Sequence, residues 1–326
     1  MIRLALLAAL LFAGCSQAPG MAADGTFPAS CDTFEAVVKA APAGATVRLS
    51  GDCGLIRLHN RTSPLTVDAT GARMRGLWLL RVEDVTWRGG TVEAPKGRDG
   101  VNFEGYGGTV EWAERVTVEG VTFTNAFRGL VTRRENSDIT IRNNIFTDLR
   151  SDGLNFTGIT RGLVEGNRFE GLTPIRSTCT FPDGRVEGGG WNKGVCEGKG
   201  GSWKDGDHSD CIQMWGTLVD VTVRGNVIRT PWPNQCQGIT TFGRRQDSYT
   251  RVLVLDNDVM TDDWNGIAVG NCTDCEVRGN RVRAATRAYA DRPYIRTYGE
   301  PPVKVCGNDV KGPHPKQRIG TGRCKA

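Results

Sequence analysis

The six residues Val277-Arg-Gly-Asn-Arg-Val282 show a pattern that recurs along the chain. Each copy begins and ends with an apolar residue and carries Gly or Asn between them. The other clear copies begin at residues 118, 141, 164, 223, 254 and 305, and a weaker copy begins at residue 87. The step from Asn144 to Asn167, and again from Asn257 to Asn280, is 23 residues. This regular spacing predicts a repeat architecture.

A repeat of this length predicts one coil of three short strands and three turns. The apolar residues point inward and stack from coil to coil, while Gly and Asn take the left-handed turn between strands. The turn asparagines are expected to form an internal ladder: Asn144, Asn167, Asn226, Asn257, Asn280 and Asn308. A second set of strand starts follows the first: Asp152-Gly-Leu-Asn155, Asp210-Cys-Ile-Gln213, Gln237-Gly-Ile-Thr240 and Asn265-Gly-Ile-Ala268. We therefore predict an all-β fold, a single-stranded right-handed parallel β-helix.

The start of the domain predicts a short capping helix. Residues 31–41 have the apolar spacing of a helix, with Asp32 and Glu35 at capping-box spacing, and Thr46-Val-Arg-Leu49 reads as the next strand. Such a helix covers the open end of the stack. The coils and the cap together resemble the pectin-lyase-like superfamily over roughly residues 28–312. Because that scaffold carries lyases, hydrolases, epimerases, esterases and phage adhesins, the resemblance implies the fold and leaves the reaction open.

The first residues predict export. Arg3 precedes an apolar run from Leu4 to Ala13 that is too short to span a membrane as a helix. Phe12-Ala-Gly-Cys15 resembles a bacterial lipobox, which implies cleavage before Cys15 and a lipid that attaches this cysteine to a membrane. An ordinary secretory signal is the alternative. We expect an outer-membrane lipoprotein or a periplasmic protein, with secretion left open, divided into a signal peptide (1–14), a linker (15–27), the β-helix domain (28–312) with an insertion (174–206), and a C-terminal tail (313–326).

The cysteines agree with an oxidising compartment. There are 11, and removing Cys15 leaves an even number. The neighbouring pairs that we expect to form disulfides are Cys31–Cys53, Cys179–Cys196, Cys211–Cys236, Cys272–Cys275 and Cys306–Cys324.

One segment concentrates chemistry-bearing residues, Asp205-Gly-Asp-His-Ser-Asp-Cys-Ile-Gln-Met-Trp215. It resembles the His-x-Asp-x-x-Gln motif of several β-helix polysaccharide enzymes. Adjacent coils are about 4.8 Å apart, so Asp152 should lie next to Asp210, and Arg150 next to His208. The predicted catalytic residues are therefore His208, Asp210, Asp152 and Arg150. His208 is the candidate base, since a neutral imidazole accepts a proton near neutral pH.

The predicted substrate is an acidic polysaccharide. The insertion holds two tryptophans whose indole faces suit sugar rings, and arginines at the coil ends suit uronate carboxylates. The expected substrate-binding residues are Asn155, Gln213, Arg128, Trp191, Trp203, Trp215, Arg244 and Arg245, with Arg133 and Arg134 beside them. The net charge of +5 is too small for a dedicated nucleic-acid binder. We expect a monomer.

The predicted reaction is β-elimination, in which a cation neutralises the uronate carboxylate, a base removes the C5 proton and an acid protonates O4. The sequence offers no evident donor to O4. The alternative to an arginine is a Ca²⁺ ion that neutralises the carboxylate, with Asp205 and Asp207 as its candidate ligands. Three other functions stay open: uronate C5-epimerisation, glycoside hydrolysis by Asp152 and Asp210, and glycan binding without catalysis.

Overall fold

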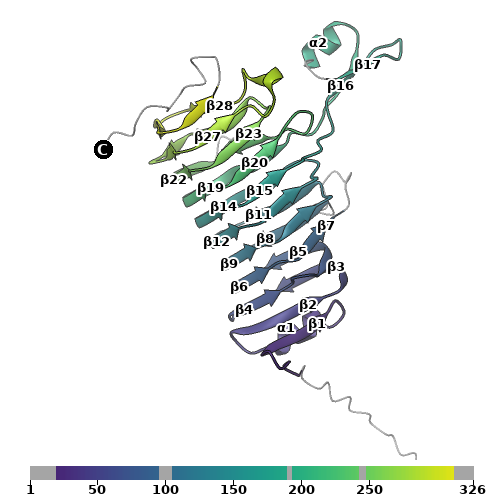
Figure 1. The fold of residues 1–326 in the computed structure, drawn as a ribbon, viewed down its shortest axis with the longest axis vertical. Helices are drawn as coiled ribbons and strands as arrows, with labels where there is room; N and C mark the ends of the chain where they lie inside the picture. The colour runs from purple at the N-terminus through teal and green to yellow at the C-terminus, as the bar shows by residue number, and fades with distance from the viewer. Residues whose placement is uncertain (1–19, 95–104, 189–192, 242–246, 312–326) are drawn as a thin grey trace, which may run out of the picture.

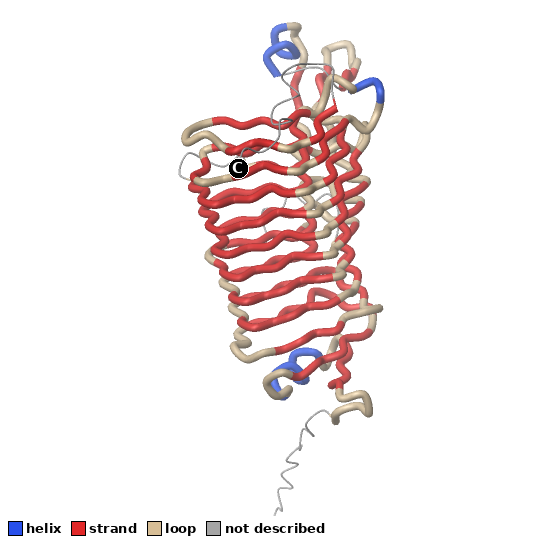
Figure 2. The backbone as a smooth tube through the Cα atoms, turned by 60° about the vertical axis from the view of Figure 1, so that its left-hand side comes forward, coloured by secondary structure: helices blue, strands red, loops and turns tan. Residues whose placement is uncertain are grey.

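The chain forms an elongated stack of coils, in which each coil contributes one strand to each of three faces (Figure 1). The structure is a computed structural model, and it describes residues 20–94, 105–188, 193–241 and 247–311. Strands of successive coils pair in parallel along the whole stack. Figure 2 shows the strands lying across the long axis of the molecule, one above another. The all-β parallel helix predicted from the repeat is confirmed.

The first sheet carries the opening residues of the repeat, such as Ile141, Val164 and Val223, in one inward row. Its strands are β1 (Thr26–Ser30), β2 (Ala45–Ser50), β4 (Leu65–Asp68), β6 (Glu83–Arg88), β9 (Glu114–Glu119), β12 (Asn136–Arg142), the second halves of β14 (Leu154–Glu165) and β19 (Asp210–Arg224), β22 (Ser248–Leu255), β25 (Cys272–Thr273), β26 (Glu276–Arg278) and β29 (Lys304–Cys306).

The second sheet follows the Gly-Asn turn and carries the closing apolar residue of each repeat. It begins with the first residues of β3 (Asp52–His59) and β5 (Arg73–Leu80), whose later residues belong to the third sheet. Its other strands are β7 (Thr91–Glu93), β10 (Thr122–Thr124), β13 (Ile145–Thr147), β15 (Arg168–Glu170), β20 (Val227–Thr230), β23 (Asp258–Thr261), β27 (Arg281–Arg283) and β30 (Asp309–Lys311). Phe123, Phe146 and Phe169 stack here, with ring centroids 5.1 Å and 4.6 Å apart. Equivalent residues of neighbouring coils thus build one continuous core.

The third sheet positions the candidate site. Its strands are β3 (Asp52–His59), β5 (Arg73–Leu80), β8 (Tyr106–Glu111), β11 (Arg128–Arg133), the first halves of β14 and β19, β21 (Gln237–Thr240), β24 (Asn265–Gly270) and β28 (Tyr294–Tyr298). Leu130, Leu154 and Ile212 lie in register and point into the core. The next residue of each strand, such as Asn155 or Gln213, belongs to the opposite, outer row.

The predicted asparagine ladder is confirmed. Asn144 Nδ2 donates to Asn167 Oδ1 at 3.0 Å, and Asn167 Nδ2 donates to Asn226 Oδ1 at 3.0 Å. The same contact repeats from Asn226 to Asn257 and on to Asn280 and Asn308. Each side chain is also the acceptor for the backbone N–H of the preceding ladder residue. The ladder therefore satisfies buried polar groups and is structural.

The N-terminal cap is confirmed as helix α1 (Phe34–Ala40). Phe34 is buried and packs edge-on against Trp87, with ring centroids 6.0 Å apart. The predicted capping box at Asp32 is wrong, because the N-cap is Thr33 and no side chain caps the first turn. Packing of Phe34, Val37 and Val38 against the end of the stack holds this helix in place.

The insertion forms an arm that projects beside the C-terminal coils (Figure 1). It contains the antiparallel strands β16 (Thr178–Thr180), β17 (Val186–Gly188) and β18 (Ser202–Lys204), and the short helix α2 (Lys193–Gly198). Its small core comprises Cys179, Phe181 and Cys196, with Trp203 packed against it. This core is separate from that of the stack. Beyond the arm, a single 3-10 turn covers Arg287–Tyr289.

The expected disulfides Cys31–Cys53, Cys179–Cys196, Cys211–Cys236 and Cys272–Cys275 are present. Cys306 is also disulfide-bonded, while its expected partner Cys324 lies outside the described residues. No helix within the described ranges is long and apolar enough to cross a membrane. Cys15, the expected lipid attachment point, is outside those ranges.

Candidate active site

Two carboxylates of adjacent coils meet at the start of the third sheet. The backbone N–H of Asp210 donates to Asp152 Oδ1 at 3.0 Å. Asp152 is 1% exposed and Asp210 is 0% exposed. The predicted proximity of these aspartates is therefore correct, but neither side chain reaches the surface. A hydrolase in which both touch the glycosidic bond does not fit this burial.

Each buried carboxylate of this dyad holds one basic side chain. Arg128 Nε lies 3.0 Å from Asp152 Oδ2, and His208 Nδ1 lies 2.9 Å from Asp210 Oδ2. The other side-chain contacts are hydrogen bonds: Thr240 donates to Asp210 at 2.8 Å, Gln213 to Asp210 at 3.2 Å, and Asn155 and Ser151 to Asp152 at 3.1 Å and 3.3 Å. Burial of two acids requires such partners. The dyad of Asp152 and Asp210 thus orients the Arg128 guanidinium and the His208 imidazole.

Burial and hydrogen bonding at the dyad shift the pKa values of Asp152 and His208. Burial raises the pKa of Asp152 to about 6, against the lowering effect of Arg128. The hydrogen bond with Asp210 raises the pKa of His208 to about 9. His208 is therefore an imidazolium at neutral pH. The sequence-based role of neutral base does not fit this state; a protonated imidazole is a proton donor.

Arg150 lies next to His208 in register but does not face a ligand. Its Nε and Nη2 lie 2.8 Å and 3.0 Å from the two carboxylate oxygens of Asp207. Asp207 Oδ2 also accepts the backbone N–H of Ile175 at 2.8 Å. This ion pair ties the base of the arm to the stack, because Ile175 lies where the arm begins. Arg150 is predicted to neutralise the charge of the substrate, but in the structure its guanidinium is paired with Asp207.

The alternative Ca²⁺ site does not fit the residues present. The Asp207 carboxylate is bound by Arg150 and by the backbone N–H of Ile175. Asp205 Oδ1 accepts a hydrogen bond from Trp203 Nε1 at 2.7 Å. Calcium needs six to eight oxygen ligands around one point. Among the described residues, no group of three or more His, Cys, Asp or Glu side chains is placed to hold a metal ion.

His208 opens into a pocket of about 290 Å³ between the third sheet and the base of the arm. The side chains that give the pocket its chemistry are Arg176, His208, Trp232, Gln237 and Asp263. His208 Nε2 lies 2.7 Å from the Gln237 side-chain amide, which in turn contacts Asn265 at 2.8 Å. In this contact the Gln237 amide nitrogen donates and His208 Nε2 accepts, so protonation of Nε2 breaks the contact and leaves an N–H for a ligand in the pocket.

Arg176 and Asp263 are pocket residues that the sequence did not single out. The Arg176 guanidinium stacks on Trp232, 3.6 Å from the ring centroid, and no carboxylate partner for it is found among the described residues. Burial raises the pKa of Asp263. Asp263 Oδ1 accepts the N–H of Asn265 at 3.3 Å. Asp263 precedes Asn265 by two residues, as His208 precedes Asp210, and this shared register was the signal that could have found it.

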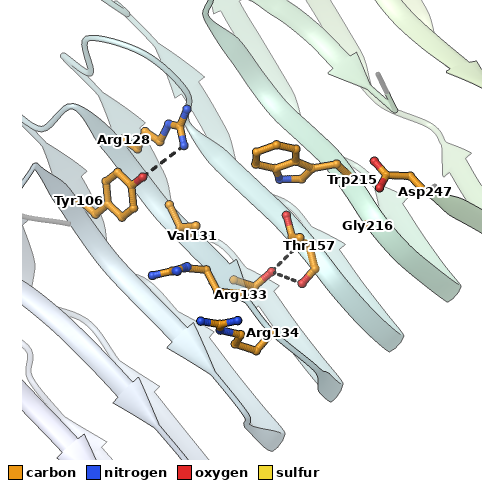
Figure 3. Close-up of a pocket in the computed structure, with 10 residues that line it drawn as sticks. Tyr106, Arg128, Val131, Arg133, Arg134, Thr157, Trp215, Gly216 and Asp247 are labelled. Atoms are coloured by element: carbon orange, nitrogen blue, oxygen red, sulfur yellow. Dashed lines mark hydrogen bonds between the residues drawn. The ribbon is translucent and has the colours of Figure 1, made fainter. Parts of the chain in front are cut away.

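A second pocket, of about 480 Å³, lies on the third sheet on the other side of the dyad. Figure 3 shows Tyr106 and Arg128 at one end, Arg133 and Arg134 along one edge, and Trp215 opposite. The predicted residues Arg128 and Trp215 thus share one pocket, while His208 lines the other. Because Arg128 and His208 are held by neighbouring carboxylates, the two pockets adjoin at the dyad.

The remaining predicted binding residues have different placements. Asn155 is fully buried and Gln213 half-buried, so both mainly support the dyad. Trp203 packs against the core of the arm and is not among the residues that line either pocket. Trp191, Arg244 and Arg245 lie outside the described residues.

A protein-family model described as "Right handed beta helix region" matches residues 44–188, which covers the first half of the stack. The chain is a right-handed parallel β-helix protein. The fold implied by the resemblance to the pectin-lyase-like superfamily is thereby confirmed. No curated protein sequence matches the chain.

Solved structures with a similar backbone include PfbA, a surface adhesin of Streptococcus pneumoniae, at 12% identity and a TM-score of 0.49, covering 78% of this β-helix protein and 67% of the adhesin. The Dettilon tailspike protein has 12% identity and a TM-score of 0.47, with 88% and 59% covered. DFA-IIIase from Arthrobacter chlorophenolicus A6 in complex with GF2 has 12% identity and a TM-score of 0.37, with 74% and 50% covered. All three TM-scores are below 0.5, so nothing about this β-helix protein follows from these likenesses.

Proposed function

We propose that this β-helix protein is an exported enzyme that cleaves a uronate-containing polysaccharide by β-elimination in the pocket of His208. The observation that supports this most is the combination in one pocket of an imidazolium, a carboxyl group and a guanidinium without a carboxylate partner. These are the three groups that the reaction needs.

Arg176 is the group that neutralises the uronate carboxylate. Its Nη2 donates hydrogen bonds to the Pro233 carbonyl oxygen and to the Gln235 side-chain oxygen. Its other N–H groups are available to a ligand in this arrangement. Stacking on Trp232 orients the guanidinium plane, which favours a two-point contact with a carboxylate. Neutralising that carboxylate stabilises the carbanion-like charge that develops at C5.

Asp263 and His208 are the base and the acid. The Asp263 carboxylate removes the C5 proton, the C5–H electrons form the C4–C5 double bond, and the C4–O4 bond breaks. His208 gives its proton to O4, so the products are an unsaturated uronate end and a new hydroxyl end. The step requires an imidazolium at His208, which its pKa of about 9 supplies at neutral pH, and an ionised carboxylate at Asp263.

A hydrolase with two carboxylates has less support. Of the aspartates near His208, Asp210 is fully buried and Asp207 is bound to Arg150. Of the described carboxyl groups that line this pocket, Asp263 is the one that is not paired with an arginine. The second pocket, with Tyr106, Arg128 and Trp215, is proposed to hold sugars that neighbour the cleaved bond.

The test is incubation of the full-length protein with alginate, pectate, glycosaminoglycans and bacterial exopolysaccharides, followed by ultraviolet absorbance of unsaturated ends and by a reducing-end assay. We expect at least one acidic polymer to give both signals. His208→Ala and Asp263→Asn should abolish them, while His59→Ala and Asp220→Asn, at exposed sites outside both pockets, should retain them.

Other outcomes point elsewhere. Reducing ends without unsaturation would indicate a hydrolase, and solvent deuterium at C5 without cleavage would indicate an epimerase. Binding of a polymer with none of these products would indicate a glycan-binding surface protein. Each of these results would overturn the lyase proposal.

A further inference from the structure

In the described part of the third sheet, the corners that follow the strands other than β21 each hold one residue in the left-handed conformation. Five described coils place Asn or Gly there, namely Asn60, Gly158, Gly216, Asn271 and Gly299. These are the residue types that tolerate positive φ best. Three consecutive coils depart from this rule, with Arg81 at φ 51°, Trp112 at φ 48° and Arg134 at φ 65°. A bulky side chain is disfavoured in this conformation, so another requirement must select these residues.

These three side chains form one exposed cluster. The Arg81 and Arg134 guanidinium carbons lie 4.9 Å and 5.4 Å from the centroid of the Trp112 ring. Trp112 is 42% exposed, and both arginines are exposed. Within the described part of the chain, no carboxylate lies within ion-pair distance of Arg81 or Arg134. The indole therefore holds two cations in place with their charge uncompensated.

A neighbouring corner shows that this lack of acids is particular to the cluster. A few residues further along each coil, a second row also takes positive φ, and there arginines alternate with aspartates. Arg115 pairs with Asp84, Arg161 with Asp138 and Arg251 with Asp220. Arginines at strained corners are thus neutralised in one row and left open in the other.

We propose that Arg81, Trp112 and Arg134 form a binding site for an anionic polysaccharide that runs along the stack toward its N-terminal coils. Arg81 and Arg134 are two coils apart, about 10 Å, which is close to the length of a disaccharide in an extended chain. Guanidinium groups bind carboxylate or sulfate groups through paired N–H bonds. Arg134 also lines the pocket of Arg128 and Trp215, so a polysaccharide bound at this site would continue into that pocket (Figure 3).

This binding site rests on the proposed function only in that its ligand is a polysaccharide. Its test measures binding and not cleavage. The probes are alginate, dextran sulfate, neutral dextran and double-stranded DNA, at low and high ionic strength, all with His208→Ala as the background so that no cleavage occurs. We expect the background protein to bind alginate or dextran sulfate and not neutral dextran. The double variant Arg81→Asn/Arg134→Asn should weaken this binding by about tenfold and make it less sensitive to salt.

The control is Arg161→Asn/Arg251→Asn, which removes the same charge from the paired row and should change the affinity by less than about twofold. Trp112→Asn should weaken binding without any loss of charge, because the two guanidinium groups are no longer held. The variants at Arg81, Trp112 and Arg134 should fold, since Asn already occupies equivalent corners at Asn60 and Asn271. The control should fold too, because aspartates, which tolerate positive φ as Asn does, occupy equivalent corners of its row.

Equal losses in the two double variants, unchanged binding by Trp112→Asn, or equally strong, salt-dependent binding of DNA would overturn the proposal. If the wild-type protein forms no unsaturated product while the corner variants still lose binding, the proposed reaction fails and this site stands.

Discussion

At the scale of single residues, the chemistry of the site depends on one buried acid. Asp210 is fully buried, and its carboxylate accepts hydrogen bonds from His208, Gln213 and Thr240. A charge that cannot be solvated by water stabilises the cation beside it, which raises the pKa of His208 to about 9. The same imidazole in water would titrate at its ordinary value of 6.5. A fully buried acid thus sets the pKa of His208.

This predicts the alkaline limb of the pH–rate profile. As a proton donor, His208 is active below its pKa, so the rate should fall as pH rises through about 9. Asp210→Asn removes the charge and should move that limb down toward 6.5. The measurement is the rate of unsaturated-product formation between these values, with circular dichroism to verify folding. A rate that instead increases through pH 9 would assign His208 the role of base.

At the scale of elements, the turn between the first and second sheets is held by the asparagine ladder. Asn226 occupies its middle: its Oδ1 accepts from the backbone and side chain of Asn167, and its Nδ2 donates to Asn257 and to the Val164 carbonyl. Each rung completes the hydrogen bonds of the coils on both sides. The ladder explains why coils of different length before and after the arm still stack in register.

Asn226→Ala should lower the free energy of unfolding by about 1–3 kcal/mol, because buried donors of Asn167 and an acceptor of Asn257 lose their partner. Urea unfolding followed by circular dichroism measures the change. Asn271→Gly is the matched control, since this exposed corner also has positive φ but joins no ladder. Equal stability of Asn226→Ala and the native protein would contradict a structural role for the rung.

At the scale of the whole molecule, the protein has two hydrophobic cores of very different size. One runs through the stack from α1 to the last described coil, and the other is the small cluster of the arm around the Cys179–Cys196 disulfide. The arm is joined to the stack by the ion pair of Asp207 and Arg150 and by Arg176, which stacks on Trp232. Regions with few buried contacts open independently of the main core.

Removing the arm disulfide with Cys179→Ala/Cys196→Ala should therefore leave the main thermal transition in place but expose residues 178–204 to protease. In contrast, Cys211→Ala/Cys236→Ala should lower the main transition, because both cysteines are buried in the stack. Calorimetry and limited proteolysis with mass spectrometry distinguish the two. A single, equally lowered transition for both pairs would show that the arm and the stack unfold as one unit.

The repeated motifs alone predicted the stack, the ladder and the neighbouring positions of Asp152 and Asp210, because copies of one motif mark equivalent residues in adjacent coils even across an insertion. They also placed His208 close to Asp210, two residues before it in the chain. The folded molecule was needed to show that Arg150 is bound by Asp207, that Arg176 and Asp263 share the pocket of His208, and that Arg81 and Arg134 flank Trp112. The first two depend on how an irregular arm returns to the stack. The raised pKa of His208, likewise, comes from a hydrogen bond to Asp210, and the full burial of that acid is a property of the packed molecule and not of any local pattern.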